Sequence, residues 1–418
     1  MIKDNIIYNS FLDWEMDISK AENDLLWDAT GKMYIDFTSG WNVVNLGWNN
    51  KEVFEEFLTC KNELNSCIWT GNHHQKEFAK ELSKYLPAQM SVFGKATGGT
   101  EANEEAIKTA RAFTGRKKIV GFKNSYHGQS IQTMSLGFSA EEMDKISSPN
   151  SDYIQMDFPN LYRTAYLRDN IIENFSNKLE EVLLHEDVAA IVTEAGIITG
   201  WGSAHVAPDS FTSVVRRLTK KYGTLWILDE VGTGFSRCGK LFGFQINNQE
   251  PDIITMAKGS TNGIQPLGTM ATTDKIAAPT LEKTNMTSTF GWNPLACKIA
   301  LKVLNIHNRD KVWEKSELDG KHVISVLEKE VGNLDYIGNI RGLGMEIGID
   351  FVEDKLSERK NTPFLERVLK ECFSRGLHLV SDHESTIQIM PPLTIVRLNL
   401  DKGLDILIEV IKQLHKNV

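Results

Sequence analysis

The 418-residue chain has few of the residues that build disulfide frameworks or zinc sites. It contains only five cysteines, and no two of them have Cys-x-x-Cys spacing. No run of about 18 apolar residues occurs, and the first residues lack a basic segment followed by an apolar core. These absences argue against a disulfide-stapled secreted domain. We therefore expect reduced thiols, no membrane association and a cytoplasmic location.

Positive charge and nucleotide-binding glycines are also scarce. Lys and Arg number 46 against 55 Asp and Glu, which gives a net charge of −9 and argues against a nucleic-acid or anionic-membrane partner. Gly232-Thr233-Gly234 lacks the third glycine of a dinucleotide fingerprint, and no helix is expected directly after it. A nucleotide-dependent dehydrogenase is therefore disfavoured, and we expect small-molecule partners.

The pattern of strands and helices predicts an α/β fold in two domains. The length exceeds the size at which single hydrophobic cores stop growing. Apolar runs alternate with amphipathic helices, which predicts a mostly parallel sheet flanked by helices; the runs are 118–122, 188–194, 224–228 and 252–256, and the helices 171–186 and 209–222. We predict a large domain at 50–293 and a smaller α+β domain formed by 1–49 and 294–418. Residues 138–165 are expected to be a surface excursion.

Two of these runs lead to residues with ionisable side chains that can take part in catalysis. The first leads to Asp229, and the second leads through Ala257 to Lys258. The separation of 258 − 229 = 29 residues suits a step between neighbouring strands, and open α/β sheets bind ligands at the carboxyl ends of their strands. Pyridoxal phosphate needs a lysine to hold its aldehyde and a carboxylate to keep its ring nitrogen protonated. By itself, Lys258 is equally well explained as a solvated lysine near a turn.

Three other stretches contain residue types that can bind a phosphate, a flat ring or a metal. Small residues at 97–100 precede a helix, whose free N–H groups suit a phosphate, although an ordinary helix start explains the same residues. Tyr126 follows the strand at 118–122, where an aromatic ring can stack on a flat ligand. His73 and His74 are adjacent, so we expect their side chains to diverge and to bind no metal.

Five short motifs occur in order and carry a family resemblance. They are Gly99-Thr100-Glu101-Ala102, Tyr126-His127-Gly128, Asp229-Glu230-Val231 with Gly234-Phe235, Lys258-Gly259, and Thr289-Phe290-Gly291 before Asn293-Pro294. Each is weak alone, but together they are specific. From about residue 30 to residue 400, the chain resembles the class III aminotransferases, fold-type I enzymes that use pyridoxal phosphate.

The resemblance implies a role for each matching residue. Lys258 looks like the Schiff-base lysine that also moves a proton, and Asp229 like the partner of the ring nitrogen. The resemblance further implies cofactor contacts from Gly99, Thr100, Tyr126, His127, Glu194 and Thr289. Thr289 would reach the phosphate of the neighbouring subunit, so a homodimer with shared active sites is implied.

Several departures from the family pattern concern the substrate. Gln388 falls where many members have a carboxylate-binding arginine, Thr199 where some have a glutamate, and Gly232 where a glutamine is common. We therefore expect a neutral or cationic amine, such as an amino sugar or polyamine, and expect Gln388→Arg to favour carboxylate-bearing substrates. The expected pocket residues are Trp41, Trp69, Trp201, Trp292 and Gln388.

Two other functions remain open at this point. Racemases and aminomutases of the same family use the same lysine and aspartate, and a detectable keto product would distinguish a transaminase from them. A non-catalytic scaffold on an inherited fold is disfavoured because Lys258 and Asp229 are both present.

Overall fold

The structure is a computed structural model that describes residues 2–3, 5–7, 16–66, 70–148, 150–163 and 168–416. The largest sheet in these residues has seven strands, in the order β6 (Met90–Ala96), β14 (Gly268–Thr273), β13 (Ile253–Met256), β12 (Leu225–Asp229), β9 (Val188–Thr193), β7 (Lys118–Phe122) and β8 (Tyr153–Met156). Strands β13, β12, β9, β7 and β8 run parallel, whereas β14 is antiparallel to both of its neighbours. The predicted α/β fold with a mostly parallel sheet is confirmed.

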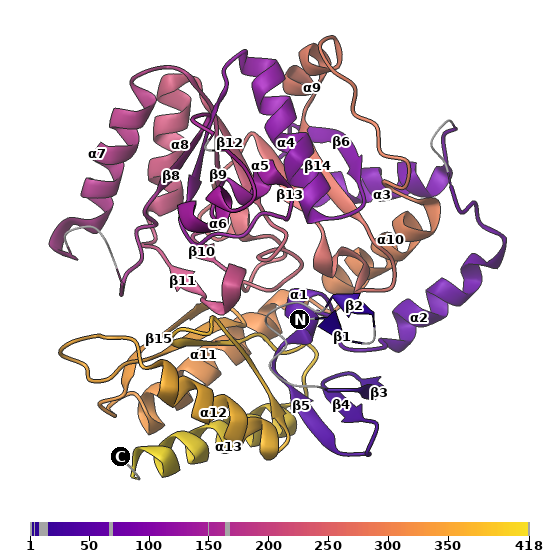
Figure 1. The fold of residues 1–418 in the computed structure, drawn as a ribbon. Coiled ribbons are helices and arrows are strands. Elements are labelled where there is room, and N and C mark those ends of the chain that lie inside the picture. The colour runs from indigo at the N-terminus through magenta and orange to yellow at the C-terminus, as the bar shows by residue number, and fades with distance from the viewer. Residues whose placement is uncertain are drawn as a thin grey trace.

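Helices cover both faces of this sheet (Figure 1). They are α3 (His73–Leu82), α4 (Gly99–Thr114), α7 (Ile171–Leu183), α8 (Phe211–Tyr222), α9 (Asp274–Leu281) and α10 (Pro294–Arg309), whereas α2 (Lys51–Leu58) packs against α10. Alternate strand residues face opposite sides, as the strand period requires. Trp226 and Leu228 of β12 belong to the core that contains α7 and α8 residues, whereas Leu225 and Ile227 belong to the core that contains the alanines of α4. Both faces are thus buried, which explains why the central strands are continuously apolar.

The C-terminal third and the N-terminal segment form a second group of elements. Figure 1 shows α11 (Val312–Glu330), α12 (Thr362–Ser374) and α13 (Arg397–His415) gathered below the large sheet with β15 (Ile337–Leu343). A four-stranded antiparallel sheet has the order β15, β16 (Glu346–Phe351), β19 (Thr386–Ile389) and β18 (Val380–Ser381). A second sheet pairs one strand of the C-terminal third with three strands of the N-terminal segment. Its order is β17 (Leu377–His378), β5 (Met33–Asp36), β4 (Leu25–Asp28) and β3 (Ile18–Glu22). The exact domain boundaries stay a prediction.

The remaining elements are short. The strands are β1 (Ile2–Lys3), β2 (Ile6–Ile7), β10 (Ile197–Ile198) and β11 (His205–Val206), and the helices are α1 (Ser39–Asn42), α5 (Ile131–Met134) and α6 (Ala140–Asp144). Single turns of 3-10 helix are η1 (Thr59–Asn62), η2 (Ser83–Tyr85), η3 (Arg168–Asn170), η4 (Gly200–Gly202), η5 (Gly243–Gln245) and η6 (Lys258–Thr261). None of the described helices combines the length and the apolar character that spanning a bilayer requires.

The prediction that residues 138–165 form a surface excursion is wrong in part. Tyr153–Met156 is β8, which pairs in parallel with β7 at the edge of the large sheet. This edge strand is only half buried over most of its length. Its apolar pattern is correspondingly short, and the surrounding Ser, Pro, Asn and Asp residues concealed it.

Candidate active site

A cavity of about 1070 Å³ opens at the carboxyl ends of β12 and β13. These strands are parallel neighbours in which Asp229 lies opposite Thr255. Lys258 comes three residues after Thr255 and therefore lies at the same end of the sheet as Asp229. The sequence-predicted residues that line this cavity are Trp41, Gly99, Thr100, Tyr126, His127, Glu194, Trp201, Asp229 and Lys258. The fold therefore brings together the acid, the amine and the glycine-rich helix start, as expected for two strands that end at one crevice.

Asp229 is buried and held by three donors. Its Oδ2 lies 2.7 Å from His127 Nδ1 and accepts a hydrogen bond of 2.8 Å from Asn103 Nδ2, while its Oδ1 accepts from the Val231 amide at 2.9 Å. Asn103 is itself oriented, because its Oδ1 accepts from Thr255 Oγ1 at 2.6 Å. The carboxylate thus has a fixed position at the cavity wall, suited to pairing with a cationic ring.

Lys258 and Glu194 line the same cavity, and the charge of each affects the pKa of the other. Burial lowers the pKa of the Lys258 ammonium, and the Glu194 and Asp229 carboxylates oppose this effect. Burial and the charge of Asp229 raise the pKa of Glu194 to about 8, although hydrogen bonds from Thr199 favour its ionised form. A lysine with a lowered pKa keeps more of its amine in the neutral, nucleophilic form.

Helix α4 begins at the cavity and leaves room for an anion there. Gly98, Gly99 and Thr100 line the cavity, and Gly98 caps the helix without a side chain. The first N–H groups and the positive end of this 16-residue helix therefore face open space. Gly128 also approaches closely: its φ is +141°, and a Cβ there would lie 2.6 Å from Thr100 Oγ1. Only glycine fits this position.

Three non-glycine residues of the cavity have left-handed backbone conformations. Trp41, Trp201 and Lys258 have φ values of 65°, 58° and 38°. Such conformations cost free energy and are often found at functional sites. Trp201 stands edge-on to Tyr126, with ring centroids 5.4 Å apart. The surrounding structure therefore holds the backbone of both tryptophans in the cavity wall in an unfavourable conformation.

Two predicted pocket residues do not line the cavity. Trp292 is buried against Phe78 and Phe93, and its Nε1 donates to Thr269 Oγ1 at 3.0 Å. Gln388 of β19 is fully buried, and its Nε2 donates to Thr199 O at 3.0 Å and to Glu346 Oε1. Trp292 is thus a core anchor, and Gln388 is a structural donor behind the cavity wall.

The other two residues predicted from the resemblance lie elsewhere. Thr289 is exposed and does not line the cavity of this single chain. Trp69 lies outside the described residues. Neither position tests the role that was expected for it.

The residues that orient the predicted ones could not be assigned this role from the sequence alone. Asn103 and Thr255 position Asp229, and Thr199 binds Glu194 through its backbone amide and through Oγ1 at 2.6 Å. Glu346 accepts from Gln388 and, at 2.8 Å, from Asn42 Nδ2. The one local signal was Asn103, which lies one helical turn after Gly99 and faces the same end of the sheet. Glu346 lies 88 residues after Lys258 and 117 residues after Asp229, so no short motif links it to them.

Comparison with known proteins places these features in one family. The sequence pattern of the class-III aminotransferases matches residues 9–411. An acetylornithine aminotransferase of Streptococcus mutans is 31% identical over 97% of this chain and 99% of its own length.

Two solved structures share the fold. A taurine:2-oxoglutarate aminotransferase from Bifidobacterium kashiwanohense, in complex with pyridoxal phosphate and glutamate, superposes with a TM-score of 0.90 at 27% identity, covering 96% of this chain and 93% of that one. A thermostable (S)-enantioselective omega-transaminase from Thermomicrobium roseum gives a TM-score of 0.87 at 28% identity, covering 96% and 92%. This chain is a fold-type I aminotransferase and belongs to the aminotransferase class-III family.

Proposed function

We propose that this aminotransferase uses pyridoxal phosphate and prefers a cationic or neutral amine over a free α-amino acid as its amino donor. The observation that carries the substrate preference is the charge of the cavity. Among the described residues that line it, Glu142, Glu194 and Asp229 are acidic. The same lining residues include one lysine, Lys258, and no arginine. A donor carboxylate therefore lacks its usual bidentate partner within this chain.

The residues of the cavity fit the cofactor. The α4 N-terminus suits the phosphate, Asp229 suits a protonated ring nitrogen, and Lys258 is positioned to hold the aldehyde. When bound, pyridoxal phosphate supplies the aldehyde that carries the amino group and a protonated ring that accepts electrons. Lys258 would move the proton, and Asp229, fixed by His127 and Asn103, would hold the positive charge of the ring.

The family and the relatives support the same chemistry. Class III aminotransferases depend on pyridoxal phosphate, and one similar structure contains it together with glutamate. Another similar structure is that of an (S)-enantioselective omega-transaminase. We include a homodimer and a cytoplasmic location in the proposal; the exposed Thr289 is available to a second subunit, and the described cysteines are free. No observation favours a racemase or an aminomutase.

The cofactor assignment is tested by reduction with borohydride. The purified chain is incubated with pyridoxal phosphate, reduced and digested, and the mass of the peptide that contains Lys258 is measured. We expect the cofactor on Lys258, and we expect Lys258→Ala to lose both this label and the visible absorbance. A label on other lysines only would contradict the assignment.

The donor preference is tested by comparing 1,4-diaminobutane, glucosamine and L-glutamate, with pyruvate and 2-oxoglutarate as acceptors. Products are identified by mass spectrometry. We expect a higher kcat/KM for one of the two amines than for L-glutamate, with formation of an aldehyde or keto product. A preference for L-glutamate would overturn the substrate proposal and leave the cofactor assignment intact. Inversion of a donor without any keto product would instead indicate a racemase.

A further inference from the structure

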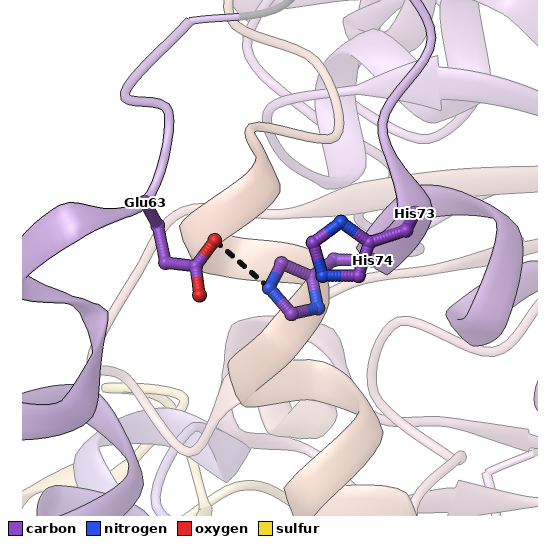
Figure 2. A group of neighbouring side chains, drawn as sticks. All are labelled: Glu63, His73 and His74. Carbon is purple, nitrogen blue, oxygen red and sulfur yellow. Dashed lines mark ion pairs between the residues drawn. The ribbon is translucent and has the colours of Figure 1, made fainter.

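Glu63, His73 and His74 gather at the start of α3 (Figure 2), and none of them lines the cavity. His73 and His74 are the first two residues of α3, and Glu63 directly follows η1. Although they are adjacent, the two imidazole rings do not diverge: their centroids are 3.8 Å apart, with 44° between the ring planes. The expectation from sequence that these side chains point apart is therefore wrong.

The three side chains present ligand atoms to one another. His74 Nε2 lies 3.0 Å from Glu63 Oε2, and one ligand atom from each of the three residues lies within 4.8 Å of the others. Two ligand atoms of a tetrahedral zinc site, each about 2.0 Å from the metal, are about 3.3 Å apart. The separation of the His74 and Glu63 atoms is thus close to the required value, and the exposed side chain of His73 is free to change its rotamer toward them.

His74 is buried, and its partners are carboxylates. Its side chain is 9% exposed, and its Nε2 forms an ion pair with Glu63 Oε2. Its Nδ1 has no hydrogen-bond partner, since Glu77 Oε2, at 3.7 Å, is too far for a hydrogen bond. The histidine thus presents Nε2 to a carboxylate oxygen, and a zinc ion could bind between these two ligand atoms.

We propose that Glu63, His73 and His74 bind a zinc ion, with water at the fourth position. Two imidazoles and one carboxylate are a common set of zinc ligands. Lys298 Nζ lies 3.2 Å from Glu63 Oε1, so Glu63 offers the metal one oxygen, Oε2. With zinc on His74 Nε2, the proton stays on Nδ1, 3.7 Å from Glu77 Oε2, and a movement of the exposed Glu77 side chain would complete a carboxylate–histidine–zinc arrangement.

The ion would tie two parts of the chain together. Glu63 lies in the segment after α2, whereas the histidines begin α3, and both helices pack against α10. Beside His74, Gln75 Nε2 donates to Trp292 O at 2.7 Å, immediately before α10 begins. We therefore expect zinc to stabilise the packing of α2, α3 and α10 and not to take part in amino transfer.

The test uses the full-length chain loaded with pyridoxal phosphate and dialysed against EDTA. Zn²⁺ is titrated in competition with a chromophoric chelator, and bound metal is counted by atomic emission. His73→Ala and Glu63→Gln are compared with His185→Ala, which removes an exposed imidazole from the turn after α7. Co²⁺ in place of Zn²⁺ reports tetrahedral geometry through its visible absorption.

We expect one Zn²⁺ per chain in the wild type and in His185→Ala. His73→Ala and Glu63→Gln should weaken zinc binding by more than 100-fold. Glu77→Gln should weaken it by about 10-fold, the low end of the range for a residue that contacts a metal ligand and not the metal itself. Because His73 is exposed, His73→Ala is expected to fold, which thermal unfolding in EDTA checks. Equal affinity of His73→Ala and the wild type, or no wild-type binding at micromolar Zn²⁺, would overturn the proposal.

Discussion

Thr199 occupies the space into which a side chain at residue 232 would project. A Cβ on Gly232 would overlap Thr199 Oγ1 and lie 3.2 Å from Thr199 Cβ. That same hydroxyl donates to Glu194 Oε2 at 2.6 Å. The two departures from the family pattern at 199 and 232 are therefore one packing arrangement, in which the absence of a side chain at 232 makes room for the hydroxyl that holds Glu194.

Gly232→Ala should consequently destabilise the chain, and Thr199→Ala should relieve part of the effect. Overpacking of this kind typically costs about 1–3 kcal/mol. We expect a lower melting temperature for Gly232→Ala and a smaller decrease when the same change is made in the Thr199→Ala background, measured by calorimetry at fixed cofactor concentration. An equal decrease in both backgrounds would show that the two residues are not coupled.

The parts of the fold that were predicted correctly depend on local pattern. Residues 188–192 and 225–228 are continuously apolar because both faces of their strands are buried, and this pattern is visible within a few residues. Asp229 and Lys258 could be placed together because Asp229 ends one such strand and Lys258 lies two residues beyond the end of its neighbour. Family resemblance then supplied the glycine-rich start of α4.

The parts that were missed depend on contacts between distant segments. Gln388 was expected in the pocket, but its partners are Thr199 and Glu346, residues from two other elements whose positions only the folded chain reveals. Trp292 was expected near the substrate, yet its aromatic partners Phe78 and Phe93 bury it. A sequence indicates which side chains are available, but not which of them face a cavity.

The raised pKa of Glu194 predicts a dependence of stability on pH. A carboxyl whose pKa is about 8 in the folded chain and about 4.5 when unfolded binds more protons in the folded state between these values. Its stabilising contribution is therefore complete below pH 4.5 and is lost as the pH rises to about 8. Each unit of pKa shift corresponds to about 1.4 kcal/mol.

The Glu194→Gln variant isolates this contribution, because it cannot titrate. The free energy of unfolding of the cofactor-free chain and of the variant is measured by urea denaturation from pH 4.5 to pH 8. We expect the difference, wild type minus variant, to decrease with rising pH. A difference that is constant over this window would contradict the assigned pKa.

Asp229→Asn should reduce amino transfer strongly while the fold is retained. The amide keeps one acceptor for His127 or Asn103 but loses the charge that would stabilise a protonated ring. Removing one such electrostatic partner typically costs about 10²–10³ in kcat. Single-turnover kinetics with the preferred donor measure the effect, and Asp209→Asn, an exposed change, serves as the control. A loss below about tenfold would remove Asp229 from its proposed role.

Gln388→Arg should give carboxylate-bearing donors no advantage, contrary to the expectation from sequence. Residue 388 is fully buried beside Glu346, so a guanidinium there would pair with that carboxylate and not reach the cavity. We expect kcat/KM for L-glutamate, relative to that for the preferred amine, to change by less than about tenfold, the factor that corresponds to 1.4 kcal/mol. A larger gain for L-glutamate would show that residue 388 reaches the substrate.

Glu142→Gln should selectively weaken the use of cationic donors. Glu142 of α6 lines the cavity, and its carboxylate also caps the helix by accepting from Ser139 N at 3.0 Å and from Ser139 Oγ at 2.8 Å. Glutamine preserves this capping box, so the variant removes charge without loosening α6. Because Glu142 is exposed, its interaction with a cation is worth at most about 1 kcal/mol, which corresponds to a two- to fivefold change.

The measurement compares kcat/KM for 1,4-diaminobutane and for glucosamine in the wild type and in Glu142→Gln, at low and at high salt. Screening by salt should abolish the difference between the two proteins, because solvent-exposed charges lose their attraction beyond a Debye length of about 3 Å at 1 M. Glu141→Gln, one residue away and outside the cavity lining, is the matched control. If the loss persisted at high salt, or if Glu141→Gln caused the same loss, Glu142 would not be the residue that recognises the charge of the donor.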